Sequence, residues 1–271
     1  MIAVLRAEIR KLKRPTLSLP TLLAASGLTA LTTSLLYLLI DSPTGNGREG
    51  MRITPERLSA SDGLVYGFQS AASLLGVIAL CVFAAQSAQE YTYGTLRNLL
   101  VRQPSRMKIL AGKYVAMSLF AVLIVLVSAI VSVAISFGLA SGAKVSTTLW
   151  SSADGQQELI TALGNVLLST ICFGTVGMIL GLLLRSPISS IAVGVIWILI
   201  VENLLSAVVN HISKWLPGQL LSAIASGGTP PDPITNAAEI SYQRGLIGGL
   251  TYVLSGMIVV SILFKKRDVA N

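Results

Sequence analysis

Long apolar runs separated by polar segments dominate the pattern along this chain. Crossing a hydrocarbon core about 30 Å thick takes roughly 20 mostly apolar residues in a helix, and six runs are long enough. Their continuity predicts helices, because the strands of a membrane barrel alternate in polarity and are about half as long. The predicted spans are Thr16–Ile40, Gln69–Ala88, Tyr114–Leu139, Leu159–Leu184, Ile188–Val209 and Gly245–Phe264. The sequence therefore predicts an all-α integral membrane protein with one transmembrane domain over residues 1–271.

The segment before the first span has an amphipathic pattern instead. Its apolar residues recur at spacings of three and four, which places them on one face of a helix, and basic residues occupy the rest. These apolar residues are Ile2, Leu5, Ile9 and Leu12. Pro15 is expected to close the helix. A basic amphipathic helix lies on the membrane surface, where anionic lipid contributes about 1 kcal/mol per basic residue. Residues 1–15 are therefore predicted to form an interfacial helix, either a topology-setting anchor or a docking element.

The distribution of charge predicts the orientation of the spans. Only 12% of residues are charged and 53% are hydrophobic, whereas soluble proteins carry about 25% charged residues. Six spans place both termini on one side, which then holds 14 of the 20 Lys and Arg residues, while the other side holds nine of the 12 acids. By the positive-inside rule both termini are cytoplasmic. The net charge of +8 is thus a topology signal for a multi-pass protein of the plasma membrane, and it predicts no nucleic-acid partner.

Motifs for catalysis and nucleotide binding are absent from the sequence or out of context. The stretch 45–50 satisfies G-x-G-x-x-G, but it follows a predicted span, whereas the dinucleotide motif lies between a strand and a helix. The sequence has no Walker A pattern and no Cys/His cluster, and both cysteines fall within predicted spans. We therefore expect no cofactor or metal in this chain and no enzyme activity of its own.

A polar loop between the second and third spans has a more specific pattern. It reads Glu-Tyr-Thr-Tyr-Gly-Thr-Leu over residues 90–96 and Pro-Ser-Arg over 104–106, followed by Lys113 at the foot of the next span. Gly94 and Thr95 are expected to end the preceding helix. A short amphipathic helix parallel to the membrane should follow, and Ser105 can cap the next one. An ordinary basic cytoplasmic loop would have a similar composition.

With this loop, the chain resembles permease subunits of the type-2 ATP-binding-cassette (ABC-2) family, in the short-form drug- and bacteriocin-resistance branch. The resemblance covers nearly the whole chain. It implies the ABC-2, type V exporter-like transmembrane fold and a coupling helix over residues 90–106 that docks on a separate ATPase. The residues that would carry this coupling are Glu90, Tyr91, Gly94, Thr95, Leu96, Pro104, Ser105 and Arg106.

The resemblance also implies the partners. Two copies of a soluble ABC ATPase would hold ATP and Mg²⁺, since no ATPase domain is fused to this chain. A second permease chain would complete a homodimer or heterodimer in the lipid of a bacterial cell membrane. The expected cargo is a drug, an antimicrobial peptide or a lipid-like molecule. Two other classes stay open: an ATP-independent channel or secondary transporter, and a membrane-embedded enzyme.

The fifth span carries a carboxylate. Glu202 lies roughly 22 Å along that helix from its start, and Ser206 and Asn210 follow at i+4 and i+8, so the three form a polar stripe on one face. Such a stripe faces a protein interior or an aqueous cavity. We expect these three residues to line a translocation pathway; the alternative is a carboxylate paired with a structural partner.

The loop after this span predicts a hairpin over residues 211–243. Its apolar part is too short to cross the membrane and its Pro-rich part cannot be helical, so a re-entrant or interfacial hairpin fits. By resemblance, it would close the outer end of the pathway. Two G-x-x-x-G patterns, at Gly177 and Gly181 and at Gly245 and Gly249, predict close helix packing within the chain.

Overall fold

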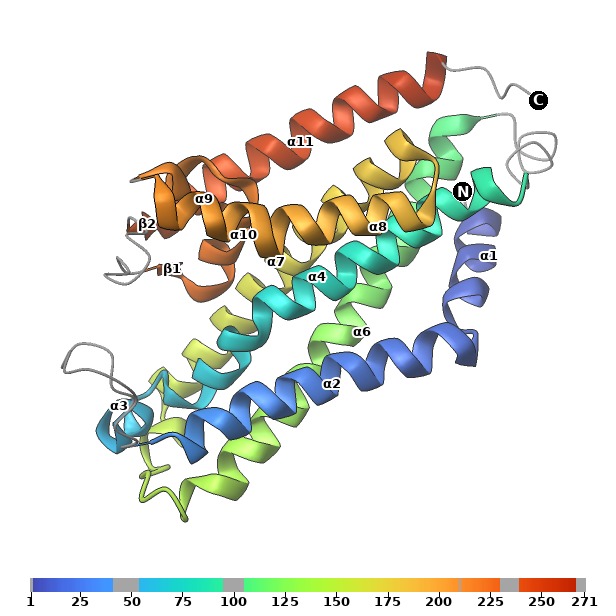
Figure 1. Ribbon diagram of the computed structural model, residues 1–271. Coiled ribbons are helices and arrows are strands. Elements are labelled where there is room, and N and C mark those ends of the chain that lie inside the picture. Colours follow the sequence, from blue (N-terminus) through green and yellow to red (C-terminus); the bar gives the residue numbers. More distant parts are fainter. Residues whose placement is uncertain (1, 41–53, 95–104, 210, 230–238, 267–271) are drawn as a thin grey trace.

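The computed structural model describes residues 2–40, 54–94, 105–209, 211–229 and 239–266, and these are mostly helical (Figure 1). Six helical segments are long and apolar enough to cross a membrane, which confirms the prediction of a mostly helical protein with six candidate spans. They are α2 (Pro15–Leu38), α4 (Gly63–Thr92), α6 (Arg106–Ala140), α7 (Ala153–Leu184), the interrupted segment Pro187–Val208, and α11 (Tyr242–Lys266).

Several helices extend beyond the apolar runs. Helix α4 starts six residues before the predicted Gln69, and α6 starts at Arg106 rather than Tyr114. A helix continues as long as its backbone hydrogen bonding continues. Its end therefore need not coincide with the point at which the side chains become polar. Gly94, at φ +64°, adopts the left-handed conformation that glycine takes most readily just after α4 ends.

The fifth span is interrupted rather than continuous. It consists of α8 (Pro187–Ile196), a π-helical turn, η3 (Trp197–Val201), and α9 (Glu202–Val208). The side-chain amide of Asn203 donates to the carbonyl oxygen of Leu199 at 2.9 Å, within this region. Turns of this kind inside α-helices are frequent at functional sites, and the hydropathy pattern gives no sign of this one.

Helices α4 and α7 form the centre of the bundle and pack along their lengths. A Cβ atom at Gly177 would collide with the backbone carbonyl of Leu80, and one at Gly181 would lie 2.7 Å from the carbonyl oxygen of Ala84. The first G-x-x-x-G pattern therefore serves close packing within the chain. Helices α2 and α6 lie on one side of α4, and α8 and α11 lie on the other (Figure 1).

A row of small hydroxyl residues joins α2 to α6. Thr29 and Thr33 on α2 and Ser128, Ser132 and Ser136 on α6 are completely buried. The hydroxyls of Thr33 and Ser132 lie 3.1 Å apart and form a hydrogen bond. Small polar residues let helices approach closely where lipid offers no hydrophobic drive for association.

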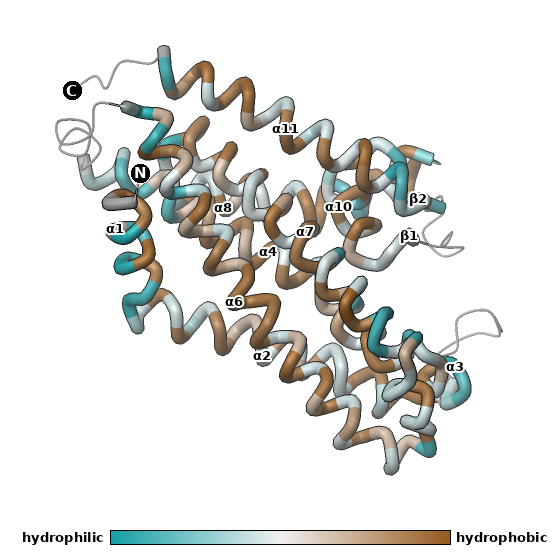
Figure 2. The backbone as a smooth tube through the Cα atoms, turned by 180° about the vertical axis from the view of Figure 1, so that it is seen from behind, coloured by the Kyte–Doolittle hydropathy of each residue, from teal (hydrophilic) through white to brown (hydrophobic). Residues whose placement is uncertain are grey.

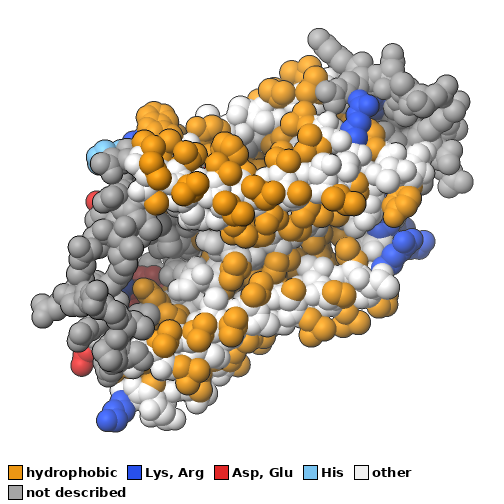
Figure 3. Space-filling view, viewed as in Figure 1, with side chains coloured by type: hydrophobic (Ala, Val, Ile, Leu, Met, Phe, Trp, Pro, Cys, Tyr) orange, Lys and Arg blue, Asp and Glu red, His pale blue; other side chains and the backbone are white. Residues whose placement is uncertain are grey.

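The surface has an apolar middle and polar ends. Figure 2 shows hydrophobic residues along the central parts of the long helices and hydrophilic residues towards their ends. In Figure 3 the Lys and Arg side chains on the visible face gather at the ends, on either side of a hydrophobic band. The first and last described residues lie at the same end of the bundle, which we call the terminal end (Figure 1). The position of these two residues at one end is consistent with six crossings; the cytoplasmic assignment of that end is a prediction from charge.

Helix α1 (Ile2–Leu12) lies across the terminal end, steeply inclined to α2 (Figure 1). The sequence suggested that Pro15 closes α1, but it does not. The helix ends at Leu12, and Pro15 is the first residue of α2, a position that suits proline because the amide there has no partner in the helix.

The opposite end, the hairpin end, holds the short elements. They are α3 (Pro55–Ser59), the 3₁₀ turns η2 (Leu149–Ser151) and η4 (Ile212–Trp215), α10 (Pro217–Ser226), and the strands β1 (Gly228–Thr229) and β2 (Ile240–Ser241). The strands pair antiparallel, with Gly228 opposite Ser241. Helix α10 is too short to span a membrane and buries Leu220, Leu221 and Ile224 against the bundle. Residues 230–238 of the predicted hairpin lie outside the described residues.

Candidate functional site

A buried ion network connects three helices at the terminal end. It comprises Glu8 and Lys11 of α1, Glu90 of α4 and Lys113 of α6. The Lys113 ammonium lies 2.9 Å from Glu90 Oε1 and 3.6 Å from Glu8 Oε2. Lys11 Nζ bridges the same two acids, at 2.6 Å from Glu8 and 3.0 Å from Glu90. Two acids and two lysines thus neutralise each other through four ion pairs, three of them at hydrogen-bonding distance.

Three of the four groups are shielded from solvent. Glu8, Glu90 and Lys113 are 2%, 6% and 3% exposed, and Lys113 also donates to the carbonyl oxygen of Gln86 at 2.7 Å. Removing charged groups from water costs several kcal/mol per ion, which only close pairing offsets. Each helix therefore needs the other two in place.

Helix α1 reaches the network because it packs closely against α6 at a glycine. A Cβ atom at Gly112 would lie 2.9 Å from Val4 Cγ1, so glycine permits this close approach. Glu8 and Lys11 are three residues apart, which places them on the same face of α1. Burial disfavours the charged form of Lys11, but the hydrogen bond to Glu8 and the negative charges of Glu90 and Glu8 outweigh it and raise the pKa of Lys11 above its ordinary value.

The structure divides the predicted coupling residues among different elements. Glu90 and Tyr91 belong to the last turn of α4, Gly94 follows its end, and Arg106 is the first residue of α6. Ser105 occupies the N-cap position, but its side chain makes no capping hydrogen bond. The predicted residues Thr95, Leu96 and Pro104, and with them most of the predicted coupling helix over 90–106, lie outside the described residues.

Three members of this predicted set, Glu90, Tyr91 and Arg106, make side-chain contacts within the chain. Glu90 is held by two lysines, as described above. Arg106 Nη1 donates to the carbonyl oxygen of Phe264 at 3.0 Å and so ties α6 to α11. The guanidinium of Arg185, between α7 and α8, lies 5.4 Å from the centre of the Tyr91 ring, in the range of a cation–π contact. These side chains hold the terminal end together.

The sequence reasoning missed Glu8 and Lys11 as partners of Glu90. One signal was present: Glu8 is the only acid in the otherwise basic segment before Pro15. An isolated carboxylate on the apolar edge of a basic helix suggests a buried cationic partner. The sequence alone could not say which lysine that would be.

A second buried carboxylate lies at the hairpin end. Glu202, the first residue of α9, is completely buried. Its Oε1 accepts a hydrogen bond from the Gly218 amide and its Oε2 one from the Gln219 amide, both at 3.0 Å. These are the second and third residues of α10, whose own N-cap residue, Leu216, has no side-chain acceptor. Glu202 therefore caps α10 from the preceding helix α9, and the dipole of α10 also favours a negative charge at this end.

Close contact with Glu202 also accounts for the glycine at position 218. A Cβ atom there would lie 2.7 Å from Glu202 Oε2. Ser206, one turn further along α9, is 4% exposed, and Asn210 lies outside the described residues. The structure thus gives Glu202 the structural partner that the sequence left open as the alternative to a pathway role.

Comparison with protein families assigns the chain to a family. The model of DUF2705, described as a protein of unknown function, matches residues 54–270. The chain belongs to the DUF2705 family. The matched range includes Glu90, Lys113 and Glu202 but not α1, which supplies Glu8 and Lys11. A comparison with curated proteins found no match. Within the described ranges, no group of three or more His, Cys, Asp or Glu residues could hold a metal ion.

Proposed function

We propose that this chain is the transmembrane permease subunit of an ATP-driven ABC-2-type exporter, with ATP hydrolysed by a separate soluble ATPase. The observation that carries the proposal is the buried ion network. It locks α1 to the end of α4 and the start of α6, the two helices that flank segment 95–104. A force applied to that segment would therefore act on α1, α4 and α6 together, because the network joins them.

A packed route leads from this unit to the hairpin end. Helix α4 packs along α7, and both contact α10. Ser73 of α4 lies 3.2 Å from the hydroxyl of Ser222, and Ser169 of α7 donates to the carbonyl oxygen of Leu221 at 2.7 Å. Movement of the central pair would therefore displace the re-entrant helix that Glu202 caps. An ATPase drives such a transition only if it binds the two permease states with different affinity.

The assembly that follows from this proposal has two permease chains and two ATPase copies, in the bacterial cell membrane with the terminal end in the cytoplasm. A second chain, identical or related, would complete the pathway between them. The cargo class is an inference from the resemblance: a drug, an antimicrobial peptide or a lipid-like molecule.

The test is copurification of the tagged full chain with its ABC ATPase, together with ATP hydrolysis in vesicles. Tyr93, next to segment 95–104, is 73% exposed. We expect Tyr93→Asp combined with Leu96→Asp to reduce ATPase association at least about tenfold, or about 1.4 kcal/mol, the loss expected of an interface anchor. Leu149→Asp, at an exposed apolar residue of the hairpin end, is the matched control. Unchanged association and hydrolysis in the double variant would contradict the proposal.

One observation favours a second candidate, an ATP-independent transporter. Interrupted spans and half-helices are typical of secondary carriers, in which a helix N-terminus faces the substrate, and this chain has both an interrupted fifth span and α10. Here, however, the first amides of α10 already bind Glu202. Transport by vesicles that contain the purified chain without ATPase or ATP would favour this candidate.

A further inference from the structure

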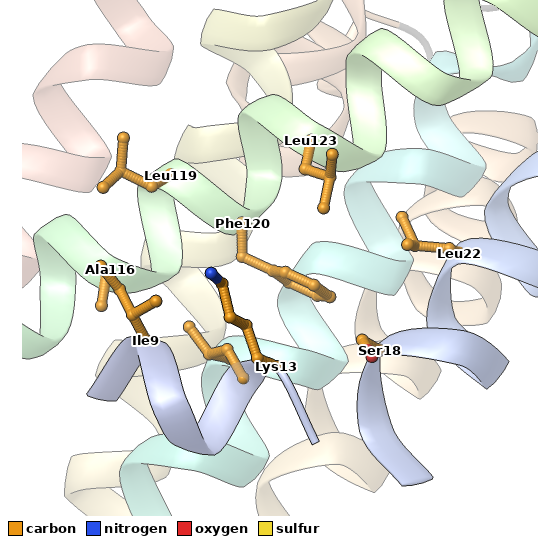
Figure 4. Close-up of a pocket in the computed structure, with 9 residues that line it drawn as sticks. Ile9, Lys13, Ser18, Leu22, Ala116, Leu119, Phe120 and Leu123 are labelled. Atoms are coloured by element: carbon orange, nitrogen blue, oxygen red, sulfur yellow. The ribbon is translucent and has the colours of Figure 1, made fainter. Parts of the chain in front are cut away.

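An apolar pocket of about 340 Å³ lies where α1, the start of α2 and α6 meet. This is within the range of small-ligand pockets, about 300–1,000 Å³. Ile9 and Leu12 line it from α1, Leu22 from α2, and Phe120 and Leu123 from α6 (Figure 4). The pocket lies apart from the ion network, whose residues do not line it.

Two of the residues that line the pocket lie on the exposed side of α6. Phe120 is 6% exposed and forms part of its wall, whereas Leu119 and Leu123 are 51% and 44% exposed. Exposed leucines on a spanning helix face hydrocarbon. An acyl chain from the surrounding leaflet could therefore enter the pocket without crossing water.

One charged residue lines this mostly apolar pocket. Lys13, between α1 and α2, extends towards α6 (Figure 4). Unlike Lys11 and Lys113, it forms no ion pair with any carboxylate in the part of the chain that the structure describes. Ser18, in the first turn of α2, lines the same pocket, and no side chain caps that helix. The positive end of α2 therefore adds to the attraction of Lys13 for an anion.

The depth of the pocket matches that of a lipid headgroup. Helix α1 lies across the end of the bundle, and the spanning helix α2 begins at Pro15. Lys13 thus lies where the polar surface segment gives way to the apolar span. At this level a phospholipid changes from charged headgroup to acyl chain.

We propose that this pocket binds one anionic phospholipid from the leaflet on the terminal side, with its phosphate at Lys13 and an acyl chain against Leu22, Phe120 and Leu123. The pairing of one free cation with an apolar pocket at the membrane surface fits this ligand better than a soluble anion, which would leave the apolar lining empty. The bound lipid would bridge α1, α2 and α6. This proposal does not depend on the proposed transport function.

The test uses native mass spectrometry of the full chain in detergent. Palmitoyl-oleoyl phosphatidylglycerol, which is anionic, is compared with palmitoyl-oleoyl phosphatidylcholine, which has the same chains and no net charge. Lys13→Gln should weaken phosphatidylglycerol binding about fivefold, the effect of one basic residue near the membrane surface. Lys108→Gln, which removes an exposed charge from α6 outside the pocket, should change it less than about twofold.

A second variant tests the apolar part. Ser18→Phe fills the pocket and leaves Lys13 intact, so it should also weaken phosphatidylglycerol binding about fivefold or more. If this variant does not yield folded protein, the Lys13 and Lys108 pair decides the question. Three results would overturn the proposal: equal binding by Lys13→Gln and the unmodified chain, an equal loss in Lys108→Gln, or phosphatidylcholine binding as tight as that of phosphatidylglycerol.

Discussion

The two ends of this bundle each bury a glutamate and neutralise it in different ways. At the terminal end, Glu90 lies between two lysine side chains that come from α1 and α6. At the hairpin end, Glu202 accepts hydrogen bonds from two backbone amides of α10. The first carboxylate depends on opposite full charges, and the second on peptide groups and the dipole of a short helix.

This difference separates two mechanical roles. The ion network spans three helices, and removing Glu90 or Lys113, which are both buried, leaves an uncompensated charge inside the protein. The Glu202 cap joins α9 to α10, so its loss affects one short helix, which keeps its contacts with α7. If the chain works as proposed, the terminal end transmits force as a unit, while the hairpin end can open locally.

The largest effect is expected when Lys113 is replaced. Lys113→Met leaves Glu8 and Glu90 buried with Lys11 as their only cation, and we expect a loss of about 3–5 kcal/mol in the free energy of unfolding. Thermal unfolding in detergent measures it. Lys108→Met, an exposed lysine on the same helix, is the control. The double variant Lys113→Met with Glu90→Gln should be less damaging than Lys113→Met alone; additive losses would mean that the pair is not coupled.

A smaller and local effect is expected at the other end. Glu202→Ala leaves the amides of Gly218 and Gln219 without acceptors, which should cost about 2–3 kcal/mol, and Glu202→Gln should cost less because one oxygen remains. Hydrogen exchange should accelerate in α10 and not in α1. Leu204→Ala, at an exposed residue of α9, is the control. Faster exchange at both ends would show that the two ends do not open independently.

The smallest effect is expected at Lys11, whose side chain is 35% exposed. Lys11→Gln should lower the free energy of unfolding by about 1 kcal/mol or less, since solvent screens partly exposed pairs. The pKa of Lys11 is raised above 10.5 in the folded protein, so its stabilisation is present at pH 7. It is lost as the pH rises through the raised pKa, because the amine then deprotonates. The difference in the free energy of unfolding between the unmodified chain and Lys11→Gln should therefore be constant from pH 7 to about pH 10.5 and shrink at higher pH. A difference that shrinks already near neutral pH would contradict this assignment.

The spans could be predicted because hydropathy is a local property. Each of the six apolar runs is recognisable from its own length and hydropathy. In lipid, the backbone groups of such a segment must form hydrogen bonds within the segment, which favours a helix. The ends of the helices were less predictable. Pro15 begins α2 rather than ending α1, because proline suits a first helical position as well as it breaks a helix. The π-helical turn at Trp197–Val201 leaves no trace in hydropathy.

The site could be predicted only in part. Glu90 and Glu202 were recognisable as unusual, since a carboxylate in a membrane span is costly unless it is paired. Their partners come from positions 8, 11 and 113 for the first and from 218 and 219 for the second. No sequence spacing relates residues so far apart.

The sequence by itself determined that this chain is a helical membrane protein with six candidate spans and an amphipathic helix before them. These properties follow from the free energy of transferring each segment into lipid, and that free energy is a sum over the residues of the segment itself. Only the tertiary structure decided that α1 closes an ion network with α4 and α6, and that Glu202 caps α10. Such pairing depends on which helix faces meet, and packing between segments distant in the sequence sets those faces.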